Sequence, residues 1–243
     1  MPKNVEKMTL NYSPNFDSKK RKKKKIKYII FHYTGMKNDK LAIRKLTSET
    51  SKVSCHYYID KNGKLIQMVP ELYTSWHAGL SSWKKDKLIN HNSIGIEISN
   101  PGHQHGYKPF GKKQLKILIS IAKYLIKKYN IKKYNILGHS DIAPLRKKDP
   151  GEKFPWKLLA HKNIGLWHKI DSKKCTRLRG NKNKLDKVIF FKKLNRFGYS
   201  TKNLSYLELK KIVKSFQRRF RPQLVNGKID NECVEILKSL ISQ

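Results

Sequence analysis

Residues 138–151 read GHSDIAPLRKKDPG, and this stretch joins a strand-like segment to a loop that carries two potential metal ligands. His139 follows the strand-like residues 134–138, and Asp149 lies ten residues further on, just before Pro150. Because proline and glycine interrupt regular structure, most of the stretch is expected to be a connection and not a continuous helix. A histidine and an aspartate on one connection are two candidate zinc ligands, so the fold has to bring any third ligand to them.

Two upstream segments supply the other groups of a hydrolytic zinc site. His32 follows the apolar run 28–31, which is too short for a buried helix and suits a central strand. Glu97 stands alone in the apolar segment SIGIEIS, where a carboxylate is costly to bury unless a polar group or a metal receives it. A catalytic zinc has three protein ligands and an open position for water, and a nearby carboxylate can take the proton of that water. The chain contains no HExxH or CxxC motif, so the ligands have to come from distant segments.

The pattern of apolar residues predicts an α/β fold with a mixed central β-sheet flanked by helices. Short strand-like runs alternate with longer stretches, and a turn at 61–64 is typical of a hairpin between two of them. Apolar residues recur at helical spacing from Leu115 to Tyr129, which predicts an amphipathic helix before the last strand. The predicted strands are 27–33, 53–60, 64–69, 94–99 and 134–138.

A smaller helical unit is predicted after the catalytic domain. The sequence becomes rich in Lys and Asn around 171–183, and we interpret 173–183 as a linker. Residues 184–243 carry apolar residues at helical spacing in three segments, which predicts a three-helix bundle. The three segments are 188–196, 205–219 and 230–242.

Five motifs relate the chain to a known family. FHYTG, SCHYYID, SWHAG, NSIGIEI and GHSDIAPLRKKDPG occur in the order seen in type 2 N-acetylmuramoyl-L-alanine amidases, zinc enzymes that share their fold with peptidoglycan-recognition proteins. The chain resembles this family over about residues 28–172. The resemblance implies that His32, His139 and Asp149 bind Zn2+. It also implies that Glu97 is the catalytic acid/base and that Lys147 stabilises the oxyanion of the tetrahedral intermediate.

The same resemblance implies a reaction, which is hydrolysis of the amide between the lactyl group of N-acetylmuramic acid and L-alanine in peptidoglycan or muropeptides. Trp76 and His77, in SWHAG, and Asn92, in HNS, are candidate substrate contacts, although His77 and Asn92 could instead shape their loops. His56 is interpreted as a hydrogen-bonded core residue. The two histidines of PGHQHG are interpreted as solvent-exposed and not as a second metal site.

The C-terminal unit resembles a second known module. Residues 216–222, with Gly227 and Asp230, are similar to the peptidoglycan-binding module that is often fused to such amidases. The similarity ends at Cys233, where that motif usually has threonine. The alternatives are a helical bundle that only stabilises the enzyme and a helix-turn-helix that binds nucleic acid.

The chain is strongly basic, with 55 Lys and Arg against 17 Asp and Glu and a formal net charge of +38. The excess is spread along the whole chain, so it suits a polyanionic environment such as cell wall or anionic lipid as well as nucleic acid. Residues 19–27 are almost purely basic and have nothing to bury, so we expect residues 1–27 to be a mobile segment. Three cysteines without a spacing pattern predict no disulfide framework.

The sequence says less about the cellular location of the protein and about alternative functions. No signal peptide is visible, and no segment approaches the roughly 20 apolar residues that span a membrane. The resemblance nevertheless favours the cell envelope, the periplasm or secretion, with cytoplasmic action on recycled muropeptides as the alternative. Two other functions stay open: a non-catalytic peptidoglycan-recognition protein, against which Asp149, Glu97 and Lys147 argue together, and a basic nucleic-acid-binding protein. We expect no specific nucleic-acid partner, and the sequence indicates neither the oligomeric state nor a preference for anhydro-muropeptides.

Overall fold

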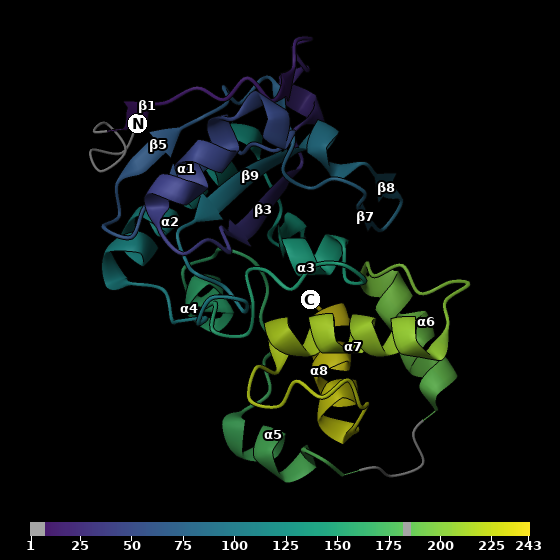
Figure 1. Cartoon of the computed structure of the whole chain (residues 1–243). Helices are drawn as coiled ribbons and strands as arrows, with labels where there is room; N and C mark the ends of the chain where they lie inside the picture. Colours follow the sequence, from purple (N-terminus) through teal and green to yellow (C-terminus); the bar gives the residue numbers. More distant parts are fainter. Residues whose placement is uncertain (1–7, 182–185) are drawn as a thin grey trace.

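A six-stranded mixed sheet forms the centre of the α/β part of the chain (Figure 1). In this computed structural model, which describes residues 8–181 and 186–243, the strand order is β1-β5-β4-β9-β3-β10. β4 and β5 pair antiparallel, as expected for the predicted hairpin, and the other neighbours pair parallel. The predicted α/β class with a mixed sheet is therefore confirmed. The strands are β1 (Thr9–Leu10), β3 (Tyr28–Tyr33), β4 (Tyr57–Ile59), β5 (Leu65–Gln67), β9 (Ser93–Ile98) and β10 (Ile136–Gly138).

Several strands are shorter than predicted, and the edge strand β1 was not predicted because it has only two residues. Residues 53–55 lie outside β4, and loops satisfy the polar groups of Ser54: Ser54 N donates to Trp76 O, and Ser54 Oγ donates to Asn15 O. The remaining short elements are the pairs β2 (Phe16–Asp17) with β6 (Thr74–Ser75) and β7 (Ser82–Trp83) with β8 (Asp86–Lys87), and the 3-10 helices η1 (Lys23–Lys25), η2 (Glu49–Ser51), η3 (Ile89–Asn92) and η4 (Lys133–Asn135).

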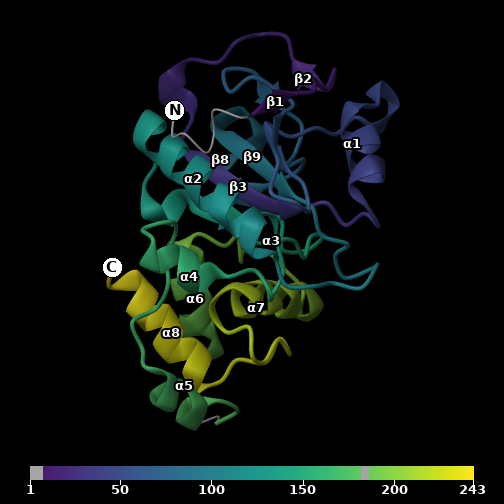
Figure 2. The ribbon, with the colours of Figure 1, turned by 90° about the vertical axis from the view of Figure 1, so that its left-hand side faces the viewer.

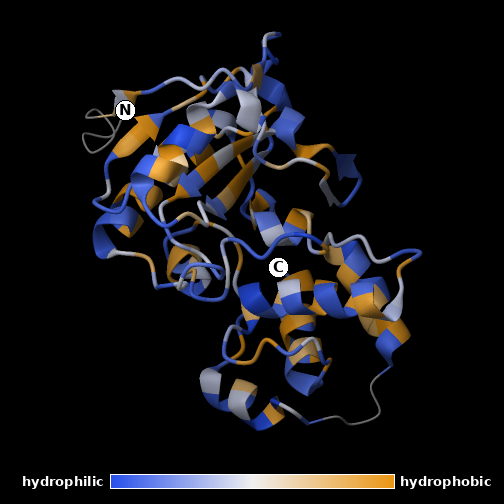
Figure 3. Cartoon of the chain, in the orientation of Figure 1, coloured by the Kyte–Doolittle hydropathy of each residue, from blue (hydrophilic) through white to orange (hydrophobic). Residues whose placement is uncertain are grey.

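Eight α-helices surround or follow the sheet within the described residues, and their order along the chain can be followed in Figure 1. The central strands carry mostly apolar residues, whereas hydrophilic and hydrophobic residues alternate along the helices (Figure 3). The helices are α1 (Asp39–Thr47), α2 (Lys112–Tyr129), α3 (His139–Ile142), α4 (Trp156–His161), α5 (Ser172–Leu178), α6 (Lys187–Phe197), α7 (Tyr206–Phe220) and α8 (Asn231–Ile241).

The two faces of the sheet are covered by different helices (Figure 2). On one face, apolar side chains of β3, β4 and β9 pack against α2, the amphipathic helix that the sequence predicts. The other face is shared. α1 covers the β4–β5 end through Ala42 and Leu46, and the C-terminal helices cover Tyr28 and Ile30 of β3. His32 lies two residues beyond Ile30 and points to the same face, so the candidate site lies between these two coverings.

The C-terminal helices share one apolar core with the sheet. Phe216 and Phe220 of α7 belong to the same buried cluster as Ile30 and Leu137 of the sheet. α6, α7 and α8 confirm the three predicted helices. No described helix combines the length and the apolar character that crossing a bilayer requires. The domain boundaries themselves stay a prediction.

Two stretches differ from the sequence interpretation. Residues 173–178 of the expected linker are helical in α5, because Asp171 caps its first turn by accepting a hydrogen bond from Lys174 N at 2.9 Å and Cys175 is buried. The last two residues of that linker, 182 and 183, lie outside the described residues. All three cysteines are buried and free of disulfides.

The expected mobile segment 1–27 is partly packed against the α/β core. Residues 1–7 lie outside the described residues, but β1 pairs with β5, and Arg21 reaches inward. The Arg21 guanidinium donates to Glu71 O at 2.8 Å and to Asn90 O at 2.9 Å, and it contacts His56 Nε2 at 2.8 Å. Burial lowers the pKa of Arg21 to about 10. The basic composition of this stretch gave no sign that Arg21, unlike its neighbours, forms hydrogen bonds inside the protein.

Candidate active site

Three side chains from separate segments meet in a triangle of donor atoms. His32 Nδ1, His139 Nδ1 and Asp149 Oδ2 are 3.0 to 3.1 Å from one another, and all three residues are buried. Tetrahedral ligands at about 2.0–2.1 Å from a zinc ion would be about 3.3–3.4 Å apart. The three donor atoms are therefore only slightly closer together here than they would be around a zinc ion. Two imidazoles and one carboxylate are a suitable donor set for a zinc ion with one open position.

The sheet register explains why these residues meet. β3 pairs in parallel with β9 so that His32 lies beside Glu97, and it pairs in parallel with β10 so that Gly138 lies beside Phe31. His139, the next residue after Gly138, therefore emerges next to His32. A Cβ on Gly138 would lie 2.6 Å from Pro150 Cδ, so glycine is required for the loop to return Asp149 to this place.

The second nitrogen of each histidine ligand has its own partner. His139 Nε2 lies 3.1 Å from Ala78 O, and His32 Nε2 lies 3.0 Å from His77 Nδ1. His77 Nε2 in turn lies 2.9 Å from Ser93 Oγ, which donates to Ile89 O. Such outer partners fix the tautomer and the orientation of a ligating imidazole, so both rings can present Nδ1 to the metal.

Two residues near His77 were not identified from the sequence. Asn90 Oδ1 accepts hydrogen bonds from His77 N at 3.1 Å and from Ala78 N at 2.7 Å, and it therefore shapes the SWHA turn. Gly95 makes room for the imidazole, because a Cβ there would lie 2.3 Å from His77 Cγ. A glycine between two isoleucines in a central strand was the available signal for this close approach.

The protonation states suit metal binding at neutral pH. Burial, together with the neighbouring His139, lowers the pKa of His32 to about 4, so its imidazole is neutral. Burial alone would raise the pKa of Asp149, but the neighbouring His139 and His32 lower it well below its usual range. Neutral imidazoles and an ionised carboxylate are the forms that bind a metal ion.

Glu97 has the electrostatic environment of a proton acceptor and donor. Burial, and then the nearby Asp149 carboxylate, raises the pKa of Glu97 to about 8. Its Oε2 is buried and has no hydrogen-bond partner among the described residues, although the Glu97 side chain contributes to a cavity of about 450 Å³. Lys147 and Asp149 line the same cavity, and the positive charge of Lys147 partly opposes the rise in the Glu97 pKa.

The structure brings most of the other candidate residues to this cavity, but not all of them. Trp76 and His77 line it, with Trp76 Nε1 donating to Asp17 Oδ1 at 2.8 Å and His77 held behind His32. Asn92 does not belong to the lining, and its backbone oxygen accepts a hydrogen bond from Lys27 N. The expected contact between Asn92 and substrate therefore has no support in the geometry.

Two other histidines near the site have different environments, His56 in the core and His103 at the rim of the cavity. His56 is fully buried, and its Nδ1 contacts Gly95 N at 3.0 Å and Ser75 Oγ at 2.8 Å, in agreement with its interpretation as a core residue. We expected His103 to be solvent-exposed, but the structure gives it two hydrogen-bonding partners. It lies 2.9 Å from Tyr33 Oη and 3.0 Å from a Glu152 oxygen, and it lines the cavity at the rim.

Comparison with known proteins agrees with this geometry. Residues 22–152 match the Amidase_2 family model, described as N-acetylmuramoyl-L-alanine amidase. The chain is 36% identical over 235 residues to the N-acetylmuramoyl-L-alanine amidase AmiD of Escherichia coli strain K12, which covers 90% of this chain and 83% of that protein. A solved complex of E. coli AmiD with the substrate anhydro-N-acetylmuramic acid-L-Ala-D-gamma-Glu-L-Lys has a TM-score of 0.80 at 35% identity, covering 90% of this chain and 89% of AmiD. AmpDh3 of Pseudomonas aeruginosa also has a TM-score of 0.80, at 28% identity, covering 96% of this chain and 98% of AmpDh3.

Proposed function

Because the chain belongs to the N-acetylmuramoyl-L-alanine amidase family, we propose that it uses zinc to cleave the amide between the lactyl group of N-acetylmuramic acid and L-alanine. The enzyme class rests on similarity over nearly the whole chain to AmiD, whose solved complex contains a substrate with this bond. The observation that supports zinc is the triangle of His32, His139 and Asp149 donor atoms. We propose peptidoglycan and its soluble muropeptides as the substrate class.

The residues of the cavity have separate roles in this proposal. When bound, zinc would supply a positive charge that polarises the scissile carbonyl and makes a water molecule easier to deprotonate. Glu97 takes the proton of that water and later delivers it to the leaving amine, a role that suits a carboxyl group with a raised pKa. The Lys147 ammonium stabilises the negative charge that develops on the carbonyl oxygen, and removing such a donor costs roughly a hundredfold or more in rate.

Substrate contacts are proposed for the cavity rim. Trp76 offers an aromatic surface there, whereas His77 acts mainly by orienting His32. The lining also carries Lys45, Arg146 and Lys148, whose positive charges suit the carboxylates of a stem peptide. This charge supports a peptide-bearing substrate over a bare glycan.

We also propose that the C-terminal helices bind peptidoglycan and that the enzyme acts in the cell envelope. Both proposals rest on the motif resemblance of residues 216–222 and on the functions expected for the family. Binding by the C-terminal helices is tested by sedimenting the full chain with insoluble peptidoglycan, using the Glu97→Ala variant so that the polymer is not degraded. Sedimentation that persists when zinc is chelated would support a binding surface outside the active site. A chain that stays in the supernatant would contradict it.

The activity is tested by mass spectrometry of the products released from purified peptidoglycan and from anhydro-muropeptides. We expect free stem peptides that begin with L-alanine, lost on chelation, restored by zinc and absent with Glu97→Ala. Zinc binding without cleavage of either substrate would favour a non-catalytic recognition protein. Strong, salt-sensitive binding of DNA that survives chelation, without cleavage, would favour the nucleic-acid alternative.

A further inference from the structure

The C-terminal helices reach the turn that carries the metal ligand His139. This turn, α3, is buried, follows β10 directly and lies beside α7, as the labels of α3 and α7 in Figure 1 show. Asp141 closes the turn, because its Oδ2 accepts a hydrogen bond from Gly138 N at 2.8 Å. Ser140 N donates to Asp149 O at 2.8 Å, so the same turn also holds the backbone of the third ligand. Any group that fixes Asp141 therefore acts on two of the three ligands.

Two side chains from the C-terminal region hold the Asp141 carboxylate. Arg219 of α7 donates from Nη1 to Asp141 Oδ2 at 2.5 Å, and Tyr199, in the α6–α7 connection, donates its hydroxyl to Oδ1. Asp141, Arg219 and Tyr199 are each at most 2% exposed. A third hydrogen bond joins α7 to the same turn, because the hydroxyl of Ser215 donates to Ser140 O at 2.5 Å. An ionised carboxylate this deeply buried depends on such partners.

Arg219 is itself held from the catalytic side. Its Nη2 donates to Ile136 O in β10 at 2.9 Å, and its guanidinium lies over the Trp156 ring at 4.3 Å. The planar guanidinium therefore bridges β10 and Asp141 in one fixed orientation. The preceding residue, Arg218, lies 3.9 Å from Glu152, which contacts His103 at the cavity rim. α7 thus contacts both the metal turn and the rim.

We propose that Arg219 and Tyr199 are positioning residues for the zinc site. They fix Asp141, and through it the turn that presents His139 and the backbone that holds Asp149. This inference rests on the proposed function, because it takes these residues as the zinc ligands. It makes the C-terminal helices a part of the catalytic unit, in addition to any role in binding peptidoglycan. Outer partners of metal ligands typically change metal affinity or activity by about 10-fold to 100-fold.

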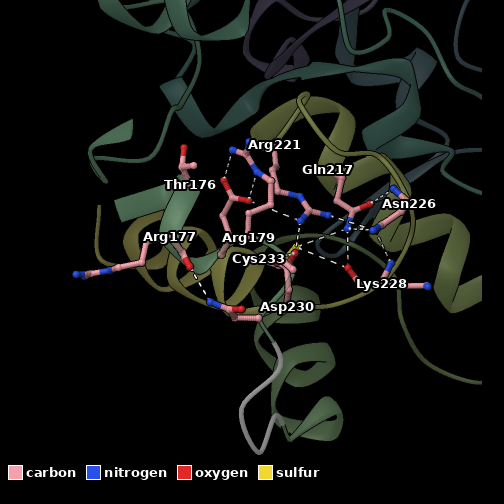
Figure 4. Close-up of polar contacts among 12 residues, drawn as sticks. Thr176, Arg177, Arg179, Gln217, Arg221, Asn226, Lys228, Asp230 and Cys233 are labelled. Carbon is pink, nitrogen blue, oxygen red and sulfur yellow. Dashed lines mark hydrogen bonds and ion pairs between the residues drawn. The ribbon is translucent and has the colours of Figure 1, made fainter. Parts of the chain in front are cut away.

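A matched control separates positioning from general stability. Arg221 is as deeply buried as Arg219, but its polar side-chain partners among the described residues, Asp230, Glu232 and Asn226, all lie in α8 or in the connection from α7 to α8. Figure 4 shows Arg221 with Asp230 and Asn226. Arg219→Met and Arg221→Met each leave a buried carboxylate without its arginine. Only Arg219→Met removes a contact with the metal turn, so only this variant should alter the zinc site.

The test measures the zinc dissociation constant of the full chain by competition with a chromophoric chelator, well below the melting temperature of each variant. We expect Arg219→Met to weaken zinc binding by about 10-fold to 100-fold and Arg221→Met to leave it within about twofold. At saturating zinc, kcat for a soluble muropeptide should fall in Arg219→Met while KM is unchanged. Arg219→Lys, which keeps the charge, should recover part of the loss.

Tyr199→Phe keeps the aromatic core and removes only the hydroxyl that contacts Asp141, so it is expected to fold and to weaken zinc binding by about 10-fold, the lower end of the range for outer partners. Wild-type zinc affinity in both Arg219→Met and Tyr199→Phe, or equal losses in Arg219→Met and Arg221→Met, would overturn the inference. A wild-type chain that binds zinc but releases no stem peptide would refute the proposed function and leave the comparison of zinc affinities intact.

Discussion

Gly95→Ala is the smallest change that should disturb the metal site without touching a ligand. The new Cβ would lie 2.3 Å from His77 Cγ and 2.6 Å from Cδ2 and Nδ1. Carbon atoms in contact are about 3.5–4.0 Å apart, so the imidazole has to move by more than about 1 Å. Strand β9 cannot move instead at low cost, because Gly95 exchanges hydrogen bonds with His56 on the neighbouring segment.

Two effects of different size follow from that displacement. The contact between His77 Nδ1 and His32 Nε2 is 3.0 Å long, and a shift of this size takes it beyond the range of a hydrogen bond. Losing this outer partner should weaken zinc binding by about 10-fold to 100-fold. Overpacking of the core should also lower the free energy of unfolding by about 1–3 kcal/mol.

The assay is a chelator competition for zinc, combined with chemical denaturation, in a double-mutant cycle with His77→Ala. Because the clash is with the His77 ring, Gly95→Ala should cost little further stability or zinc affinity once that ring is absent. Gly111→Ala is the control, since its Cβ would make an ordinary contact of 3.5 Å with Gln114 Oε1. Wild-type zinc affinity in Gly95→Ala, or an equal loss in the His77→Ala background, would refute the reasoning.

Three further outcomes are expected. Glu97→Gln should keep its zinc, measured by elemental analysis, and lose about 10²-fold to 10⁴-fold in kcat; a variant that keeps wild-type kcat would exclude Glu97 as the proton carrier. Because the pKa of Glu97 is raised to about 8, the native metal-free chain keeps a proton on Glu97 between pH 6.5 and 8 that the unfolded chain has lost, whereas His32, His56 and His77, whose pKa values are lowered by burial, bind fewer protons in the native chain. The free energy of unfolding of the metal-free wild type, taken relative to that of metal-free Glu97→Gln so that the histidine contributions cancel, should therefore fall by up to about 2 kcal/mol over that range, and a constant difference would contradict the raised pKa. Arg21→Met should destabilise the chain by about 1–3 kcal/mol in thermal or chemical denaturation, because it strands the buried acceptors Glu71 O and Asn90 O, whereas exposed Lys22→Met should stay within about 0.5 kcal/mol.

The sequence predicted the individual strands and helices better than it predicted which of them lie side by side. The strand around His32 and the helix that ends at Tyr129 follow from local periodicity, and both were confirmed. The parallel pairing that sets His32 beside Glu97 does not follow from either strand alone, because the register is fixed by packing between distant segments. Grouping these residues in one site therefore depended on the order of five motifs and not on periodicity.

The groups behind the ligands were harder to find, because their partners are far away in the sequence. In the sequence, Asn90 looks like an ordinary turn residue. Only the structure shows that two backbone amides donate hydrogen bonds to its side chain. Arg21 was hidden in a basic run, where composition favours a solvated segment. In both cases one side chain satisfies two backbone groups that lie at least 12 residues away in the sequence, and no local pattern encodes such a pairing.

Arg219 is different, because the sequence does contain a signal for it. Ile212, Phe216 and Phe220 define the buried stripe of α7, and Arg219, three residues after Phe216, falls on the same stripe. A charged residue at such a position has to be paired, since an isolated buried charge is too costly. The sequence could therefore have predicted a buried acidic partner for Arg219, and the structure identifies it as Asp141 of α3. A bundle that served only to bind the cell wall would have no need of a buried charge facing the metal turn, and this is why we treat α7 as part of the catalytic unit.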